Sequence, residues 1–153
     1  MPYCVDTSAW MDGWVRYYPP DVFPTLWNNF DPFIDDGEII SSEEVYVETA
    51  KKADELHKWI QNRKHMLVPL TTDIQRIATE LLSDYPRLVD TLKGRSQADP
   101  FVIATAIEKD AIVVTGEIRT ANLKKPRIPD VCDARGIRWI GFLQMIRELK
   151  LTF

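Results

Sequence analysis

Apolar residues along the chain form short runs separated by longer stretches with helical spacing. The short runs predict β-strands at residues 3–7, 38–41, 66–70, 111–115 and 137–140. The longer stretches predict helices at residues 21–33, 42–63, 72–82, 99–109 and 142–149. Short apolar strands that alternate with helices are typical of an α/β protein whose mostly parallel sheet is covered on both faces. We therefore expect a three-layer α/β/α sandwich.

Local signals set the expected boundaries of several elements. Pro19-Pro20 ends any preceding helix, and Asp21 is suited to begin the next one. Asp99 before Pro100 is the pattern of a helix N-cap followed by proline at the first helical position. Residues 93–97 form a polar connector, and residues 119–129 form a basic loop that contains proline. Without a repeat or interdomain linker, residues 1–153 are expected to form one domain.

The composition is that of an ordinary globular protein, with 45% hydrophobic and 27% charged residues in 153 positions. No apolar run approaches the roughly 18 residues needed to span a bilayer, and the first residues lack the features of a signal peptide. These patterns predict a cytoplasmic protein that does not enter a membrane. Cys4 and Cys132 are far apart, so neither a disulfide framework nor a zinc site is expected, and Cys4 is predicted to be a buried thiol.

Charge is distributed unevenly. The net charge is −4, but residues 93–153 contain 11 basic and 7 acidic side chains, whereas residues 1–92 contain 8 basic and 16 acidic ones. Such asymmetry can place a basic surface beside an acidic pocket, although solvated faces without a partner explain it equally well.

Four acidic residues occupy positions that converge in an α/β fold. Asp6 follows the first predicted strand, and Glu117 follows the strand at residues 111–115. Asp99 begins a helix, and Glu48 lies one turn into the helix that follows the second strand. Ligand sites in open α/β sheets form beyond the carboxyl ends of the strands. We therefore expect these four carboxylates to meet at one edge of the sheet.

Each acid also has a structural interpretation. Asp6 could end a strand, Asp99 could cap a helix, Glu48 could pair with Lys52 and Glu117 could belong to a turn. Together, however, neighbouring carboxylates repel one another and raise one another's pKa unless a cation neutralises them. Glu44 adds to this charge, because it lies one helical turn before Glu48.

Carboxylates without histidine or cysteine are ligands suited to Mg²⁺ or Mn²⁺. One or two such ions support phosphodiester hydrolysis. Other phosphate-binding arrangements fit less well, since the sequence has neither a GxGxxG nor a Gly-rich loop ending in Lys-Ser/Thr. A haloacid-dehalogenase-type phosphatase has a second aspartate where Ser8 stands.

Four segments in the same order resemble those of PIN domains over nearly the whole chain. They are Tyr3-Cys4-Val5-Asp6-Thr7-Ser8, the segment from Ile40 to Glu48, the segment from Ala98 to Ala106, and Val113-Val114-Thr115-Gly116-Glu117. Residues 17–27 and 128–132 look like a PIN-like subgroup of bacterial and archaeal proteins related to VapC toxins.

The resemblance implies a Mg²⁺- or Mn²⁺-dependent ribonuclease that leaves a 5′-phosphate and acts as the toxin of a toxin–antitoxin pair. Asp6, Glu48 and Asp99 would hold one ion, and Glu117 would serve a second ion or orient the attacking water. Ser8 and Thr115 would donate hydrogen bonds to a carboxylate, a metal-bound water or a phosphate. The resemblance also implies an RNA substrate, a homodimer and an antitoxin partner.

Two further groups have an open interpretation. Arg119, Lys124, Lys125 and Arg127 would contact the RNA backbone or would form a solvated loop. The aromatic residues Trp10, Trp14, Tyr17 and Tyr18 could stack on bases, although a core or a protein interface is favoured.

The sequence departs from the PIN pattern at two positions. The fourth acid is commonly aspartate, and here it is Glu117; Thr49 stands where an aliphatic residue is common. The alternative functions are a catalytically silent PIN-like module that binds RNA or protein, and a structure-specific DNA nuclease. The latter usually needs a longer helical arch than this chain allows.

Overall fold

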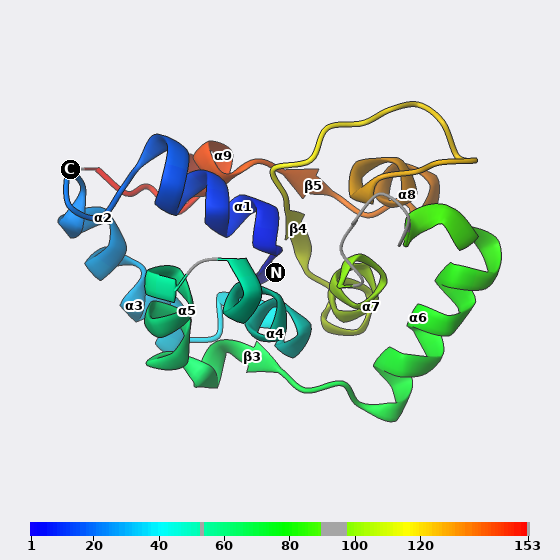
Figure 1. Ribbon diagram of the computed structural model, residues 1–153, viewed down its shortest axis with the longest axis horizontal. Coiled ribbons are helices and arrows are strands. Elements are labelled where there is room, and N and C mark those ends of the chain that lie inside the picture. Colours follow the sequence, from blue (N-terminus) through cyan, green and yellow to red (C-terminus); the bar gives the residue numbers. More distant parts are fainter. Residues whose placement is uncertain (53, 90–97, 153) are drawn as a thin grey trace.

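The computed structural model describes residues 1–52, 54–89 and 98–152, and it is built around a single parallel sheet (Figure 1). The five strands lie in the order β3-β2-β1-β4-β5. Every pairing between neighbours is parallel. The strands are β1 (Tyr3–Val5), β2 (Ile39–Ser42), β3 (Leu67–Val68), β4 (Ile112–Val114) and β5 (Trp139–Ile140). The α/β class and the mostly parallel sheet expected from the sequence are thus confirmed.

The connections between these strands are helical. The first half of the chain contains α1 (Thr7–Met11), the π-helix η1 (Asp12–Tyr17), α2 (Pro24–Asn29), α3 (Asp31–Asp35), α4 (Glu43–Lys52) and α5 (Asp54–Gln61). The rest contains η2 (Lys64–Met66), α6 (Thr72–Asp84), η3 (Pro86–Leu88), α7 (Asp99–Lys109), α8 (Ile128–Arg135) and α9 (Phe142–Glu148). Helix α7 packs against β1, β2 and β4, with α6 and α8 beside it.

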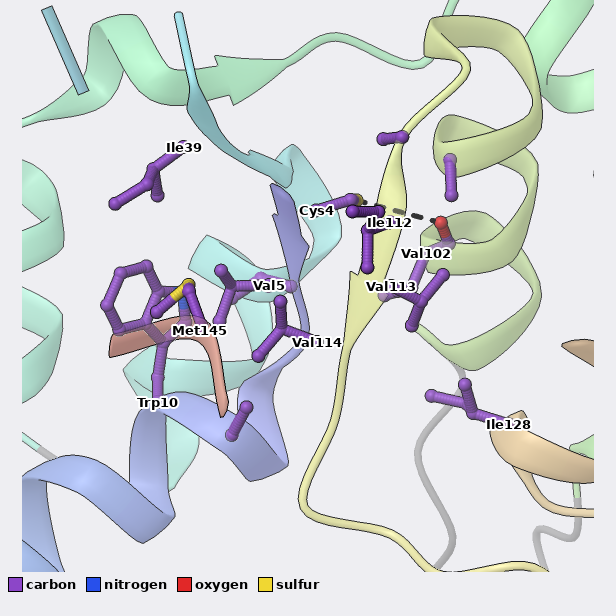
Figure 2. Close-up of a cluster of buried hydrophobic side chains, with 14 of the residues drawn as sticks. Cys4, Val5, Trp10, Ile39, Val102, Ile112, Val113, Val114, Ile128 and Met145 are labelled. Carbon is purple, nitrogen blue, oxygen red and sulfur yellow. Dashed lines mark hydrogen bonds between the residues drawn. The ribbon is translucent and has the colours of Figure 1, made fainter. Parts of the chain in front are cut away.

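Strands β1 and β4 are buried on both faces, which explains why they appear in the sequence as continuous apolar runs. Trp10 and Met145 lie on one side of β1 and β4, and Val102 and Ile128 lie on the other (Figure 2). The Cys4 thiol donates a hydrogen bond to the carbonyl oxygen of Val102 over 3.8 Å. Cys4 is completely buried, as predicted, and both cysteines are free thiols.

An aromatic cluster fills the space between the sheet and the helices α1, α2, α5 and α9. The buried ring of Trp10 lies 5.3 Å from that of Trp59 and about 6 Å from those of Trp27, Phe30 and Phe142. The Trp10 indole N–H donates to the Ser41 hydroxyl, which donates to the carbonyl oxygen of Val5. Helix α1 is therefore fixed to the sheet immediately after β1.

Several boundaries differ from those predicted. The helix expected at residues 21–33 begins at Pro24 and divides into α2 and α3, with proline in the first turn of each. Asp99 is not an N-cap, because Ala98 occupies that position and Asp99 is the first helical residue. The end of the predicted loop at residues 119–129 forms the start of α8. The connector at residues 93–97 lies outside the described residues.

None of the helices in the described ranges is long and apolar enough to cross a membrane.

The π-helix η1 brings its backbone close to the aromatic cluster at Gly13. A Cβ atom at this position would lie 2.5 Å from Cζ of Phe142. The Phe142 ring is itself packed against Trp10, Trp27 and Phe30, so it has little room to move.

We predict that Gly13→Ala lowers the free energy of unfolding by about 1–3 kcal/mol, the usual cost of overpacking a core. Gly141→Ala is the matched control, because a Cβ there would meet no atom within 4 Å. Chemical denaturation of both variants measures the difference. Equal stability of the two would show that the close contact at Gly13 carries no strain.

Candidate active site

The candidate site lies where the strand order reverses. The chain builds β2 and β3 on one side of β1, then returns to place β4 and β5 on the other. The carboxyl ends of β1 and β4 therefore diverge into different connections, which is where α/β proteins bind ligands. A cavity of about 730 Å³ opens there, and its wall includes all four of the predicted acids, Asp6, Glu48, Asp99 and Glu117. We call this cavity the acidic pocket.

Asp6 is the most constrained of the acids. It is the N-cap of α1, and its Oδ1 accepts hydrogen bonds from the Ala9 N–H at 2.9 Å and the Ser8 hydroxyl at 2.7 Å. Its Oδ2 accepts from the Thr115 hydroxyl at 2.9 Å. Burial raises the pKa of Asp6 to about 7, with a contribution from Glu117, although these hydrogen bonds oppose the rise.

Ser8 and Thr115 thus donate to a carboxylate, one of the three acceptors considered from the sequence. They also connect the chain after β4 to α1. The Gly116 N–H donates to the Ser8 hydroxyl, and the Glu117 N–H donates to the Thr115 hydroxyl. The backbone that carries Glu117 is therefore hydrogen bonded to the same two side chains that hold Asp6.

Asp99 is buried at the start of α7 and interacts with the other acids. Asp99 is the first helical residue and is not the cap. Burial is the largest cause that raises the pKa of Asp99 well above its ordinary value. The charges of Glu117 and Asp6, a hydrogen bond with Glu117 and the charge of Glu48 raise it further. The four acids are therefore close enough to influence one another.

Glu48 and Glu117 are less buried than the two aspartates. Glu48 reaches the pocket from α4, and the Lys52 side chain considered as its partner lies outside the described side chains. A carboxylate oxygen of Glu117 lies 3.6 Å from the Arg127 guanidinium. Glu117 thus stands between the pocket acids and a cation from the loop.

Of the four predicted basic residues, Arg119 and Arg127 line the acidic pocket. Arg119 also donates to Asp133 and lies over the Trp139 ring, with its Cζ atom 5.1 Å from the ring centroid. Lys124 and Lys125 are exposed and are not among the described residues of the pocket wall.

Glu44 and most of the aromatic residues lie elsewhere. Glu44 is not among the described wall residues, although it lies in the same helix as Glu48. Trp10 is completely buried in the aromatic cluster, and Trp14 and Tyr18 pack beside it, as favoured from the sequence. Tyr17 is 61% exposed.

Asp12 and Arg16 line the same pocket from η1, and sequence reasoning missed them. A Cβ atom on Gly116 would lie 2.3 Å from Oδ2 of Asp12, so this carboxylate packs directly against the backbone before Glu117. The spacing of Ser8, Asp12 and Arg16 was an available signal, because it places all three on one helical face.

Asp130 was also missed, and it organises the loop between β4 and α8. Its carboxylate accepts hydrogen bonds from the N–H groups of Thr120, Ala121 and Arg127 at 2.8 Å each, and from the Thr120 hydroxyl at 2.7 Å. Burial raises the pKa of Asp130, but these hydrogen bonds outweigh burial and lower it. Pro129 and Asp130 in the first helical turn were the sequence signal for α8.

The donor atoms suit a hard divalent cation, but no coordination shell is preformed. Across the described ranges, no group of three His, Cys, Asp or Glu side chains is arranged to hold a metal ion. Two observations nevertheless fit a divalent cation in the acidic pocket. Asp6 and Asp99 have raised pKa values that a cation would lower. Thr7, a wall residue, has the one buried side-chain oxygen in the described part of the chain that lacks a hydrogen-bond partner.

Residues 3–153 match the model of a protein family described as "Domain of unknown function (DUF4411)". The chain belongs to this family. The sequence matches none of the curated proteins with which it was compared.

The DUF4411 chain is similar in fold to a chain of a solved structure. The neighbour is a chain in the crystal structure of VapBC2 from Rickettsia felis bound to a DNA fragment from their promoter. The similarity has a TM-score of 0.55 at 15% sequence identity, and it covers 92% of this chain and 98% of that one. The fold is therefore PIN-like, as the sequence resemblance implied.

We predict that without divalent ions the DUF4411 chain loses stability as pH rises from about 4 to about 7. Asp6 has a folded-state pKa near 7, against about 4 when unfolded, so the folded state binds more protons throughout this window. The effect of this one group is about 4 kcal/mol. Thermal unfolding in EDTA across this pH range measures it.

Asp6→Asn should reduce this pH dependence without abolishing it, because the pKa of Asp99 is raised as well. Asp110→Asn is the control, because Asp110 is exposed in a left-handed conformation that asparagine also favours. Stability that rises with pH over this window in the unmodified protein would contradict the prediction.

We further predict that Asp130→Ala lowers the free energy of unfolding by about 3 kcal/mol, because hydrogen bonds to a charged acceptor are lost together. The amide hydrogens of Thr120, Ala121 and Arg127 should also exchange faster, because each of these N–H groups donates to the Asp130 carboxylate. Hydrogen exchange with mass spectrometry measures this. Unchanged protection of the loop would show that Asp130 does not hold it.

Proposed function

We propose that this protein is a metal-dependent nuclease that hydrolyses RNA phosphodiester bonds. The observation that carries the proposal is the meeting of Asp6, Glu48, Asp99 and Glu117 in one pocket at the carboxyl ends of β1 and β4. Burying several acids together is unfavourable, and it is typical of sites whose charge is balanced by a ligand.

Asp6, Glu48 and Asp99 would hold one Mg²⁺ or Mn²⁺, and Glu117 would serve a second ion or orient the attacking water. When bound, such an ion polarises the phosphate and lowers the pKa of its water ligand. The chain's own contribution is to position these acids. Ser8 and Thr115 fix the Asp6 carboxylate through hydrogen bonds to both of its oxygens.

The pocket wall also offers cations to a phosphate. Arg119 and Arg127 come from the loop that Asp130 organises, and both are partly exposed at the acidic pocket. Guanidinium groups bind phosphate oxygens through paired N–H donors. In this proposal they hold the substrate backbone, and Lys124 and Lys125 add positive charge further along the same exposed loop.

The similarity to a VapBC2 chain supports a role as the toxin of a toxin–antitoxin pair, with an antitoxin protein as partner. A homodimer stays a prediction of the family resemblance. The alternatives are a catalytically silent module that binds RNA or protein, and a DNA nuclease.

Incubation of the purified protein with single-stranded RNA, duplex RNA and DNA, in Mg²⁺, Mn²⁺ or EDTA, tests the proposal. We expect cleavage of RNA that requires the divalent ion. Asp6→Asn and Asp99→Asn should each reduce the rate at least about 100-fold, because each removes several kcal/mol of electrostatic stabilisation.

Glu117→Asp should retain more activity than Glu117→Gln, since it keeps the charge. Asp110→Asn again serves as the control for loss of an exposed acid. Cleavage that survives both Asp6→Asn and Asp99→Asn would reject the site. Binding of RNA without cleavage in any metal would favour the silent module, and cleavage of DNA alone would favour the DNA nuclease.

A further inference from the structure

A third arginine lines the acidic pocket, and it comes from a different element than Arg119 and Arg127. Arg16 lies on η1 and lines the pocket. Along the chain η1 directly follows α1, which is labelled in Figure 1. The Arg16 guanidinium donates to Oδ1 of Asp12 at 3.1 Å, and its side chain is 69% exposed. The pocket therefore has basic residues on two separate parts of its wall.

The orientation of this helical face is fixed by the core. Trp10 and Gly13 bury the opposite side of α1 and η1 in the aromatic cluster, with Trp10 also hydrogen bonded to Ser41. Because one face is anchored, Ser8, Asp12 and Arg16 must face the pocket. Arg16 is thus placed at the pocket by the same packing that positions Asp6.

The ion pair with Asp12 uses only part of the hydrogen-bonding capacity of the Arg16 guanidinium. A guanidinium has five N–H donors, and the contact with Asp12 Oδ1 joins one nitrogen to one oxygen. The remaining donors form the planar fork that binds phosphate oxygens in pairs. The Asp12 carboxylate also packs against the backbone at Gly116, so the pair lies between η1 and the chain after β4.

We propose that Arg16 is a substrate-binding residue that contacts a backbone phosphate of the nucleic acid, with Arg127 contacting the strand from the loop. The two arginines would hold the strand at two points, so that the phosphodiester bond between them faces the buried acids. This inference rests on the proposed function, because it requires a nucleic-acid substrate in the acidic pocket.

Fluorescence anisotropy with a labelled single-stranded RNA tests the proposal in Ca²⁺, with gel analysis to show that the RNA stays intact. We expect Arg16→Gln to weaken binding about three- to tenfold at low salt. Loss of one phosphate contact should also reduce the slope of log K against log salt by about 0.7. Arg16→Lys should keep most of the slope while losing part of the affinity.

Arg76→Gln is the matched control, because Arg76 is also exposed and paired with an acid, Glu80, but lies on α6 away from the pocket wall. Melting temperatures equal to that of the unmodified protein would establish that both variants fold. If the unmodified protein binds RNA and Arg16→Gln binds as Arg76→Gln does, the role of Arg16 is overturned. If the unmodified protein binds no nucleic acid, the proposed function itself fails.

Discussion

The buried carboxylate of Asp6 joins the three elements from which the site is made. It directly follows β1, caps α1 and accepts a hydrogen bond from the hydroxyl of Thr115, the residue after β4. Ser8 and Thr115 in turn accept hydrogen bonds from the backbone that leads to Glu117. A carboxylate can hold this junction because it accepts several hydrogen bonds at once. Asp6 thus acts together with the Trp10–Ser41 hydrogen bond to fix α1, and its partners Ser8 and Thr115 bind the backbone that leads to Glu117.

Such a junction costs stability, and the large aromatic core offsets that cost. Asp6 and Asp99 are both almost completely buried, and their raised pKa values measure how unfavourable their charged forms are. The rings of Trp10, Trp27, Phe30, Trp59 and Phe142 pack on the other face of α1. Each buried ring removes a large apolar area from water. The core thus holds α1 rigid beside acids that repel one another.

The sequence predicted the parts of this arrangement that depend on buried strands. Apolar runs located all five strands to within a few residues, and parallel strands place their carboxyl ends at one edge, so Asp6 and Glu117 could be assigned to the same region. Asp12 and Arg16 were not assigned to the pocket from the sequence. The many aromatic residues on both sides of Pro19-Pro20 made the polar helical face of Ser8, Asp12 and Arg16 hard to recognise. Asp130 looked like part of a loop, since its four hydrogen bonds depend on how residues 120–127 fold back.

The acids and arginines of the acidic pocket do not balance one another in charge. Asp6, Asp12, Glu48, Asp99 and Glu117 face three arginines, Arg16, Arg119 and Arg127, so the wall has a formal charge of two minus when every acid is ionised. The raised pKa values of Asp6 and Asp99 mean that protons partly offset this excess without a metal. One divalent cation would offset it fully and displace those protons. In the proposed nuclease a phosphate anion is therefore accepted only with the metal, because the arginines alone do not outweigh the acids.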